Sequence, residues 1–366
     1  MPTAYSADIL FTGDEWLHQH AVLVSNGIIT DIIPTQFISP VFNVTHYGGS
    51  IMAPAFIDLQ IYGGLGKLFS QDPSTETLKA MLAYCKTGGA SYFLPTVATN
   101  TTEVFYRAID AVRSYWREGG TGVLGLHIEG PWINRLKRGA HVAALVQIPT
   151  LKDVSALLEY GRDVIKMITL APEVCSAEII QLIQANDVIV SAGHSNATFA
   201  EATQAFDDGI FLATHLYNAM SQLQSREPGL VGAIMQHDAV MSSIIPDGQH
   251  VDFAVLSIAK KVMKERLFII TDAVTDTKDG PYPHQREGNK YVAAGTLSGS
   301  ALTMAAGVKN CVEYADIELD EALRMASLYP AQVIGMQNQL GRLVKGAAAD
   351  FVVLDSNLEV VLQKRD

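Results

Sequence analysis

Apolar, strand-like segments alternate with helical segments along most of this chain of 366 residues, and this alternation restricts its possible folds more than any other feature. Five helical patterns lie between several of the apolar segments: TETLKAMLAYCKTGG, TEVFYRAIDAVRSYW, AEIIQLIQAND, TFAEATQAFDDG and VDFAVLSIAKKVMKE. Near-continuous apolar strands separated by helices are typical of a parallel sheet. Eight such strands predict an α/β fold of the (β/α)8 TIM-barrel type, and an open doubly wound sheet is the alternative. The apolar segments lie at 51–59, 91–97, 122–128, 165–170, 188–192, 210–214, 242–246 and 267–271.

Both ends of the chain differ from its middle, because they contain short strand patterns without helices between them. In residues 7–50, the turn Ser25-Asn26-Gly27 separates two apolar runs and predicts a hairpin. The C-terminal stretch LVKGAAADFVVLDSNLEVVLQ has the same character. We therefore expect residues 1–50 and 336–366 to form one small β-sandwich domain, and residues 51–335 to form the catalytic barrel.

The composition indicates a globular protein with a large core, because 48% of the residues are hydrophobic and only 17% are charged. The formal net charge of −12 opposes binding to nucleic acid, whose phosphates repel an acidic protein. Cys85, Cys175 and Cys311 are odd in number and far apart, so we expect core thiols in a reducing compartment. No apolar run approaches the ~18–20 residues of a membrane helix, and the N-terminal segment has no basic region. We therefore expect a cytoplasmic protein without a membrane partner.

A titratable or hydrogen-bonding side chain stands near the end of almost every predicted strand. In barrels of this type, the active site lies at the carboxyl ends of the strands. A nearly complete ring of such side chains therefore predicts an active site at this end of the barrel. The ring consists of Gln60, Thr96, Glu129, Glu173, His194, His215, Asp247, His250 and Asp272.

Three residues of this ring have the composition of a metal site. His194 and His215 are 21 residues apart, which is about one strand-helix unit, so they should lie on neighbouring strands. Neighbouring strands are ~4.8 Å apart, which allows two imidazoles to bind one metal ion. Two histidines and a carboxylate, here Glu129, with a position left for water, are typical of a catalytic zinc site. Hydrogen-bonded core histidines are the alternative for each residue singly, but the set favours a metal.

Asp272 follows the last predicted strand and is our candidate for the general base. A buried aspartate is costly unless it meets a cation or takes part in chemistry, and near an activated water it could accept a proton. The alternative is that the Asp272 carboxylate binds the metal ion, or lies farther from it and only supports the site. His127 lies on the same side of its strand as Glu129, and we interpret it as a packing residue or a support for the ligands.

The motifs at these positions resemble those of the N-acetylglucosamine-6-phosphate deacetylases of the amidohydrolase superfamily. The combination of HIEGP, GHSNAT and THLYNAM is more specific than any single motif, and the resemblance covers nearly the whole chain. Further matching stretches are APAFIDLQ, KRGAH, LAPE, REPGLVGAIM, DGQHVD, ITDA, GTLSGSALTM, LYPAQVIG and GRLVKGAAADFVVLD.

The resemblance implies roles for individual residues. Glu129, His194 and His215 match metal ligands, and Asp272 matches the catalytic acid and base. Arg226 and His250 match phosphate-binding residues, and Arg226 is expected to reach the neighbouring active site of a homodimer or a dimer of dimers. The full set of implied substrate-binding residues is Ala140, His141, Asn218, Ala219, Arg226, His250, Leu297, Ser298 and Gly299.

One departure from the superfamily pattern concerns the number of metal ions. Many members carry His-x-His at the end of the first strand, where a second metal binds, but this chain has Gln60-Ile61-Tyr62. Gln is a weak neutral ligand and Tyr is a poor one at neutral pH. We therefore expect one divalent metal per subunit, with Zn²⁺ first and Fe, Mn, Co or Ni as alternatives. Gln60 then marks a vestigial second-metal position.

The resemblance implies hydrolysis of N-acetyl-D-glucosamine 6-phosphate to D-glucosamine 6-phosphate and acetate. In this mechanism a metal-activated water attacks the amide, and Asp272 transfers the proton to the amine. One alternative is a mononuclear amidohydrolase that acts on another N-acylated amine. Another alternative is a regulator that binds sugar phosphates without catalysis. The expected partner is a small phosphorylated amino sugar, with neither nucleic acid nor a membrane.

Overall fold

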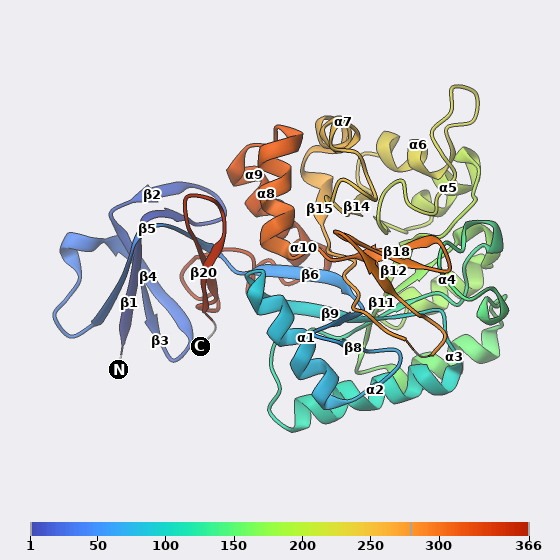
Figure 1. Ribbon diagram of the computed structural model, residues 1–366, viewed down its shortest axis with the longest axis horizontal. Coiled ribbons are helices and arrows are strands. Elements are labelled where there is room, and N and C mark those ends of the chain that lie inside the picture. The colour runs from blue at the N-terminus through green and yellow to red at the C-terminus, as the bar shows by residue number, and fades with distance from the viewer. Residues whose placement is uncertain (1, 279, 365–366) are drawn as a thin grey trace.

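The computed structural model describes residues 2–278 and 280–364, and a barrel of parallel strands forms its larger part (Figure 1). Eight strands follow one another in the order β6-β9-β10-β11-β12-β13-β14-β15. A bridge between Ile61 and Ala273 joins the end of the first strand to the segment after the last, so the sheet closes on itself. The predicted barrel is thus confirmed. Its strands are β6 (Phe56–Ile61), β9 (Ala90–Ala98), β10 (Leu126–Glu129), β11 (Ile165–Leu170), β12 (Ile189–Ala192), β13 (Leu212–Ala213), β14 (Met241–Ile244) and β15 (Leu267–Ile269).

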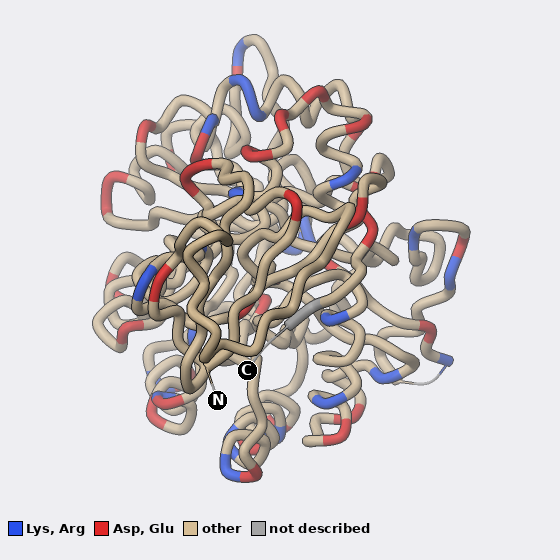
Figure 2. Tube along the Cα trace, turned by 90° about the vertical axis from the view of Figure 1, so that its left-hand side faces the viewer, with Lys and Arg blue, Asp and Glu red and all other residues tan. Residues whose placement is uncertain are grey.

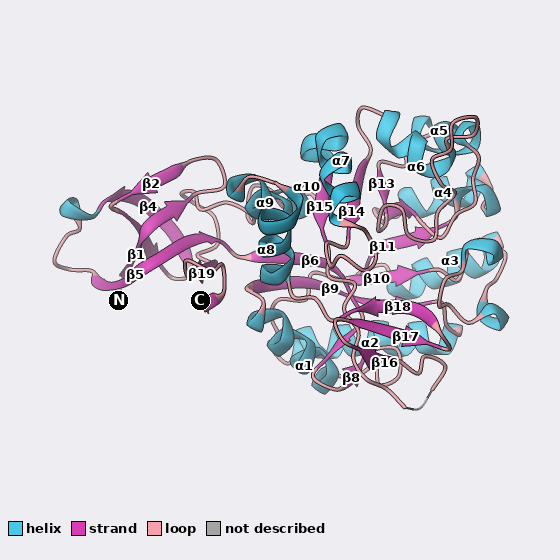
Figure 3. Cartoon of the chain, turned by 45° about the horizontal axis from the view of Figure 1, so that its top comes forward, coloured by secondary structure: helices cyan, strands magenta, loops and turns pink. Residues whose placement is uncertain are grey.

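Helices surround the barrel strands, and all five helical patterns recognised in the sequence form helices (Figure 3). Each of the five begins after a Ser, Thr or Asp whose side chain accepts a hydrogen bond from a backbone N–H of the first turn. These helices are α1 (Thr75–Thr87), α2 (Thr102–Arg117), α4 (Ala177–Gln184), α5 (Phe199–Asp207) and α7 (Phe253–Met263). Five further helices are α3 (Leu151–Gly161), α6 (Gly229–Gln236), α8 (Met304–Ala315), α9 (Leu319–Ala326) and α10 (Leu328–Val333).

A separate seven-stranded sheet contains strands from both ends of the chain, as expected (Figure 1). Its order is β20-β19-β5-β1-β3-β4, and β2 pairs with β1. Asn26 and Gly27 join β3 to β4 with φ angles of 51° and 74°, which a tight hairpin of type I′ requires, so the predicted hairpin is confirmed. The strands are β1 (Thr3–Phe11), β2 (Trp16–His18), β3 (His20–Ser25), β4 (Ile28–Pro34), β5 (Asn43–Pro54), β19 (Phe351–Leu354) and β20 (Val360–Lys364).

The apolar run at 51–59 is divided between the two sheets rather than forming one barrel strand. β5 continues to Pro54, which pairs with Phe351 of the terminal sheet, and β6 of the barrel begins at Phe56. Both stretches are apolar because each lies in a hydrophobic core, so composition alone does not separate them. The division into residues 1–50 with 336–366 and residues 51–335 stays a prediction, with β5 crossing its first boundary.

A small three-stranded sheet lies beyond the last barrel strand and forms part of the active-site end. It contains β16 (Gln285–Glu287), β17 (Lys290–Ala293) and β18 (Thr296–Ser300). The Ser300 N–H donates to the Asp272 carbonyl at 3.0 Å, and the Val274 N–H donates to the Ser300 carbonyl at 3.1 Å. These bonds fix the end of β18 beside the carboxyl end of the barrel. Nearby, β7 (Gly63–Gly64) and β8 (Lys67–Leu68) form a two-residue ribbon.

One large hydrophobic cluster fills the barrel and the layer between its strands and helices, and smaller clusters pack within the terminal sheet. Cys85 and Cys311 are buried free thiols and Cys175 is partly buried, as predicted from their spacing. Lys and Arg are interspersed with Asp and Glu on the outer loops and helices (Figure 2). Among the described residues, no helix is both long and apolar enough to cross a membrane.

Candidate active site

A cavity of about 250 Å³ contains nearly all of the predicted site residues. It lies at the carboxyl ends of the barrel strands, where the sequence placed the site. The predicted residues that line it are Glu129, Ala140, His141, His194, His215, Asn218, Ala219, His250, Asp272, Leu297, Ser298 and Gly299. Gln60 lies just behind its wall, and Arg226 is outside it. The lining residues that the sequence analysis did not select are Tyr62, Leu68, Ser70, Gly139, Ile245, Val274, Tyr282 and His284.

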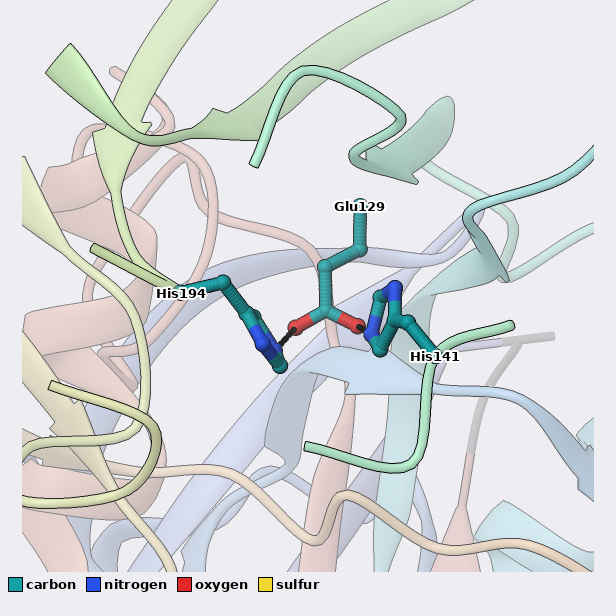
Figure 4. Close-up of side chains that lie close together, drawn as sticks. All are labelled: Glu129, His141 and His194. Carbon is teal, nitrogen blue, oxygen red and sulfur yellow. Dashed lines mark hydrogen bonds and ion pairs between the residues drawn. The ribbon is translucent and has the colours of Figure 1, made fainter. Parts of the chain in front are cut away.

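Glu129, at the end of β10, lies among three imidazoles. Its Oε1 is 3.0 Å from His215 Nε2 and 3.3 Å from His194 Nε2, and its Oε2 is 3.0 Å from His141 Nε2. Figure 4 shows the His141 and His194 rings on opposite sides of the carboxylate. Burial opposes the charge on Glu129, but His194 and His141 outweigh burial and hold its pKa well below the usual range. Glu129 is therefore an anionic carboxylate inside a cage of nitrogen donors.

The backbone directs the histidines into this cage through unusual φ angles. His194 and His215 follow β12 and β13 with φ of 48° and 40°, and Asp272 follows β15 with φ of 54°. Such angles are uncommon for residues other than glycine and are found preferentially at functional sites. Three of the predicted site residues thus leave their strands by the same turn of the backbone, which points their side chains toward the barrel axis.

The donor set of this cage fits a divalent metal ion. His194 Nε2 lies 3.1 Å from His215 Nε2, and both approach Glu129 Oε1. His194 Nδ1 lies 2.9 Å from the Lys137 carbonyl, a contact that fixes the ring and leaves Nε2 with its lone pair. His215 Nδ1 is buried without a hydrogen-bond partner in the described part of the chain. Two imidazoles and one carboxylate with converging donor atoms are a typical zinc ligand set.

His141 is an alternative third ligand for a metal ion in this cage. Ligand atoms of Glu129, His141 and His194 all lie within 4.8 Å of one another, so this trio also has the spacing of a metal site. His141 Nδ1 lies 2.7 Å from Thr99 Oγ1, so both of its ring nitrogens have partners. Burial and the neighbouring His194 lower the His141 pKa to about 4, so the ring is neutral at neutral pH. A neutral imidazole can serve either as a ligand or as a hydrogen-bond donor.

Asp272 faces the cage from the end of the last strand. It is 9% exposed, and Gln60 Nε2 donates to its Oδ1 at 2.9 Å. Burial raises its pKa, as expected for a carboxylate that can hold and release a proton. Gln60 Nε2 also lies 3.0 Å from Glu129 Oε1, and the Tyr62 hydroxyl donates to Glu129 Oε2. The two positions of the missing His-x-His pair therefore contact carboxylates of the site directly.

Cationic side chains are scarce in the cavity. Among its lining residues in the described chain there is neither Lys nor Arg. His250 lines one side, and its Nδ1 lies 2.6 Å from Asp247 Oδ2, a contact that fixes the orientation of the ring. Arg226 is exposed, and no acidic side chain among the described residues, Glu227 included, forms an ion pair with it.

Glu173 of the predicted ring and the nearby His127 lie outside the cavity lining and support the site. Glu173 accepts hydrogen bonds from Ser195 and from the Asn196 N–H, and so holds the loop that follows His194. His127 is buried, with Nδ1 near the Leu59 carbonyl and Nε2 2.8 Å from Thr169 Oγ1. Both of its nitrogens are occupied, in agreement with a packing role. The ring of polar groups therefore includes residues that line the cavity and residues that support the surrounding structure.

Comparison with known proteins agrees with this geometry. The amidohydrolase family matches residues 51–366, and the NagA composite domain matches residues 7–46. The chain belongs to the amidohydrolase family.

Relatives of this amidohydrolase are deacetylases of two sugar phosphates. It is 36% identical to an N-acetylglucosamine-6-phosphate deacetylase of Haemophilus influenzae, over 96% of this chain and 95% of the relative. It is 33% identical to an N-acetylgalactosamine-6-phosphate deacetylase of Escherichia coli O157:H7, over 96% and 94%. The crystal structure of N-acetylglucosamine-6-phosphate deacetylase from Pasteurella multocida matches it with a TM-score of 0.96 at 33% identity, covering 100% of this chain and 98% of that one.

Three of the unanticipated cavity residues of this amidohydrolase, Tyr62, Tyr282 and His284, carry polar rings. Tyr62 could have been found, because side chains two residues apart on a strand share a face, and Gln60 was already selected. Tyr282 and His284 come well after the last strand, in a loop without hydrophobic periodicity. They reach the cavity because the three-stranded sheet folds back over the barrel, and no local pattern indicates that contact.

Proposed function

We propose that this amidohydrolase hydrolyses the acetamide of N-acetyl-D-glucosamine 6-phosphate and releases acetate and D-glucosamine 6-phosphate. The convergence of Glu129, His194, His215 and Asp272 in one buried cavity is the observation that carries the proposal. The similarity to sugar-phosphate deacetylases over almost the entire chain supports the substrate class. This set of groups gives no specific support to hydrolysis of an unrelated amine or to a silent regulator.

Glu129, His194 and His215 would hold one divalent metal ion, with Zn²⁺ proposed first. When bound, such an ion supplies Lewis acidity for the acetamide carbonyl and lowers the pKa of the attacking water. Asp272 is placed to accept the proton of that water and to return it to the departing amine. A base that also acts as the acid needs a pKa near the working pH, and the raised pKa of Asp272 agrees with this use.

His141, His250 and Arg226 would bind the polar groups of the substrate. His141 lies beside Glu129 and would donate to the carbonyl oxygen as negative charge develops there. His250, paired with Asp247, would meet the phosphate. Because the lining lacks Lys and Arg, we propose that Arg226 of a second subunit completes the phosphate site in a homodimer. The compartment we propose is the cytoplasm.

The deciding experiment is acetate release from N-acetylglucosamine 6-phosphate by the purified protein. Acetate should form with the phosphorylated sugar, stop after chelation and return with added Zn²⁺. N-acetylglucosamine without the phosphate should react far more slowly, because the contacts of Arg226 and His250 are lost. N-acetylgalactosamine 6-phosphate is the second substrate to test, since relatives with that name are 33–36% identical to this chain. Absence of acetate from both sugar phosphates with metal-loaded protein would refute the proposal.

A further inference from the structure

His284 lines the cavity but has no part in the chemistry proposed above. It lies just before β16, in the loop that brings the three-stranded sheet over the barrel. Only 5% of the residue is exposed, so it is part of the wall rather than the surface. Its ring is parallel to that of Tyr282, with an interplanar angle of 11° and centroids 6.2 Å apart. Tyr282 in turn meets the His141 ring edge-on, which connects this wall to the metal cage.

The two ring nitrogens of His284 have different environments. Nδ1 lies 2.9 Å from the Ser298 hydroxyl, which belongs to β18. Nε2 has no hydrogen-bond partner among the described residues, and it is not one of the fully enclosed nitrogens that lack one. Because His284 lines the cavity, Nε2 is the ring nitrogen that is free to bind a ligand there. A ring nitrogen on a residue that lines a cavity, with no partner within the protein, is available to hydrogen-bond a bound ligand.

The charge state of the His284 ring limits the kinds of ligand group that Nε2 can bind. Burial lowers the His284 pKa to about 4, so the ring is neutral at neutral pH. A neutral imidazole has no net charge to attract a phosphate, so the ring is better suited to an uncharged polar group. A neutral ring also donates or accepts at Nε2, depending on the tautomer chosen with Ser298. A hydroxyl group, which both donates and accepts, matches either tautomer.

We propose that His284 is a substrate-binding residue whose Nε2 hydrogen-bonds a hydroxyl of the amino sugar. The proposal rests on the proposed function, because it takes a sugar phosphate as the ligand. Ser298 then has two tasks: it lines the cavity itself and orients the His284 ring. The loop after the last barrel strand would bind a hydroxyl group of the sugar, while residues at the carboxyl ends of the barrel strands would carry out the hydrolysis.

Two substitutions separate this role from a purely structural one. In His284→Asn the side-chain amide overlaps the position of Nδ1, so the contact with Ser298 can remain while Nε2 is lost. In His284→Gln the amide reaches the position of Nε2, so the ligand contact can remain while the Ser298 contact is lost. His284→Phe keeps the ring and removes both nitrogens. The thermal midpoint of each metal-loaded variant checks its folding.

The measurement is kcat and KM for acetate release from N-acetylglucosamine 6-phosphate. The KM of the Asn and Phe variants should rise about 3–10-fold, as for one neutral hydrogen bond, with the Gln variant near wild type. An equal rise in the Asn and Gln variants, or a larger rise in the Gln variant, would overturn the proposal and leave His284 as a support for Ser298. If the wild-type protein released no acetate, the proposed function would be refuted, and this proposal would be refuted with it.

Discussion

Gln60 Nε2 donates to Asp272 Oδ1 at 2.9 Å and so joins the end of the first barrel strand to the end of the last. The same nitrogen lies 3.0 Å from Glu129 Oε1, so one neutral amide lies between the proposed base and a proposed metal ligand. The Tyr62 hydroxyl oxygen lies 2.7 Å from the same nitrogen, so the two hydrogens of the amide NH2 are shared among three oxygen atoms. This uncharged amide stands at the position that the motifs predict to be a vestigial second-metal site.

We expect one tightly bound metal ion per chain. The Gln60 amide already engages the carboxylates that would hold a second ion, and a neutral amide is a weak ligand. Elemental analysis of purified protein, before and after dialysis against a chelator and refilling with Zn²⁺, checks the number. Two ions that both survive gel filtration would contradict this role of Gln60.

Asp272→Asn should keep the metal and lose most of the turnover. The amide can replace the carboxylate sterically but cannot accept a proton, so kcat should fall about 10²–10⁴-fold. Acetate release and metal content are measured on the same sample. Asp238→Asn, an exposed aspartate away from the cavity, is the matched control. Near-normal turnover in the Asp272 variant would assign the base to another group.

Tyr62→Phe should weaken metal binding without unfolding the protein. The lost hydroxyl donates to Glu129 Oε2, and loss of a group that orients a ligand typically costs about 10–100-fold in metal affinity or activity. Competition with a chromophoric chelator gives the dissociation constant. Tyr314→Phe removes a hydroxyl from a tyrosine that is 59% exposed and should leave that constant unchanged. Unchanged affinity in both variants would show that Glu129 needs no support from Tyr62.

The buried Asp58 should make stability decrease as the pH rises from about 4 to about 7. Burial raises its pKa from 3.8 to about 7, although hydrogen bonds from Thr271 oppose that rise. Between these values the folded protein keeps a proton that the unfolded chain has released, so the free energy of unfolding falls with pH. Asp58→Asn lacks this titration. Its urea midpoint relative to wild type should therefore increase from pH 5 to pH 7 and then level off; a constant difference would contradict the raised pKa.

Arg226→Ala should raise KM about 10–150-fold, the cost of a charge-assisted phosphate contact. If the arginine acts across a dimer, mixing this variant with Asp272→Asn subunits should restore activity. Such a heterodimer has one site with both an intact base and an intact arginine. Differently tagged subunits allow the heterodimer to be isolated after exchange. A verified heterodimer without recovered activity would show that Arg226 does not serve the neighbouring site.

Much of the site could be predicted because strand ends are visible in the sequence. His194, His215 and Asp272 directly follow apolar runs, and the carboxyl ends of barrel strands meet around one axis. The hairpin at Asn26-Gly27 and the five capped helices were equally local signals. In each case the structure depends on residues within one or two turns of chain.

Contacts between distant segments were decided only by the tertiary structure. The run at 51–59 is divided between two sheets because β5 pairs with β19 from the far end of the chain. His284 reaches the cavity because β18 is bonded to the segment after β15. Gln60 and Tyr62 acquire their roles from carboxylates on other strands. The sequence by itself determined which residues stand at strand ends, since that is a local property; which of them meet, and through which atoms, depended on the closure of the barrel and on the sheet folded over it.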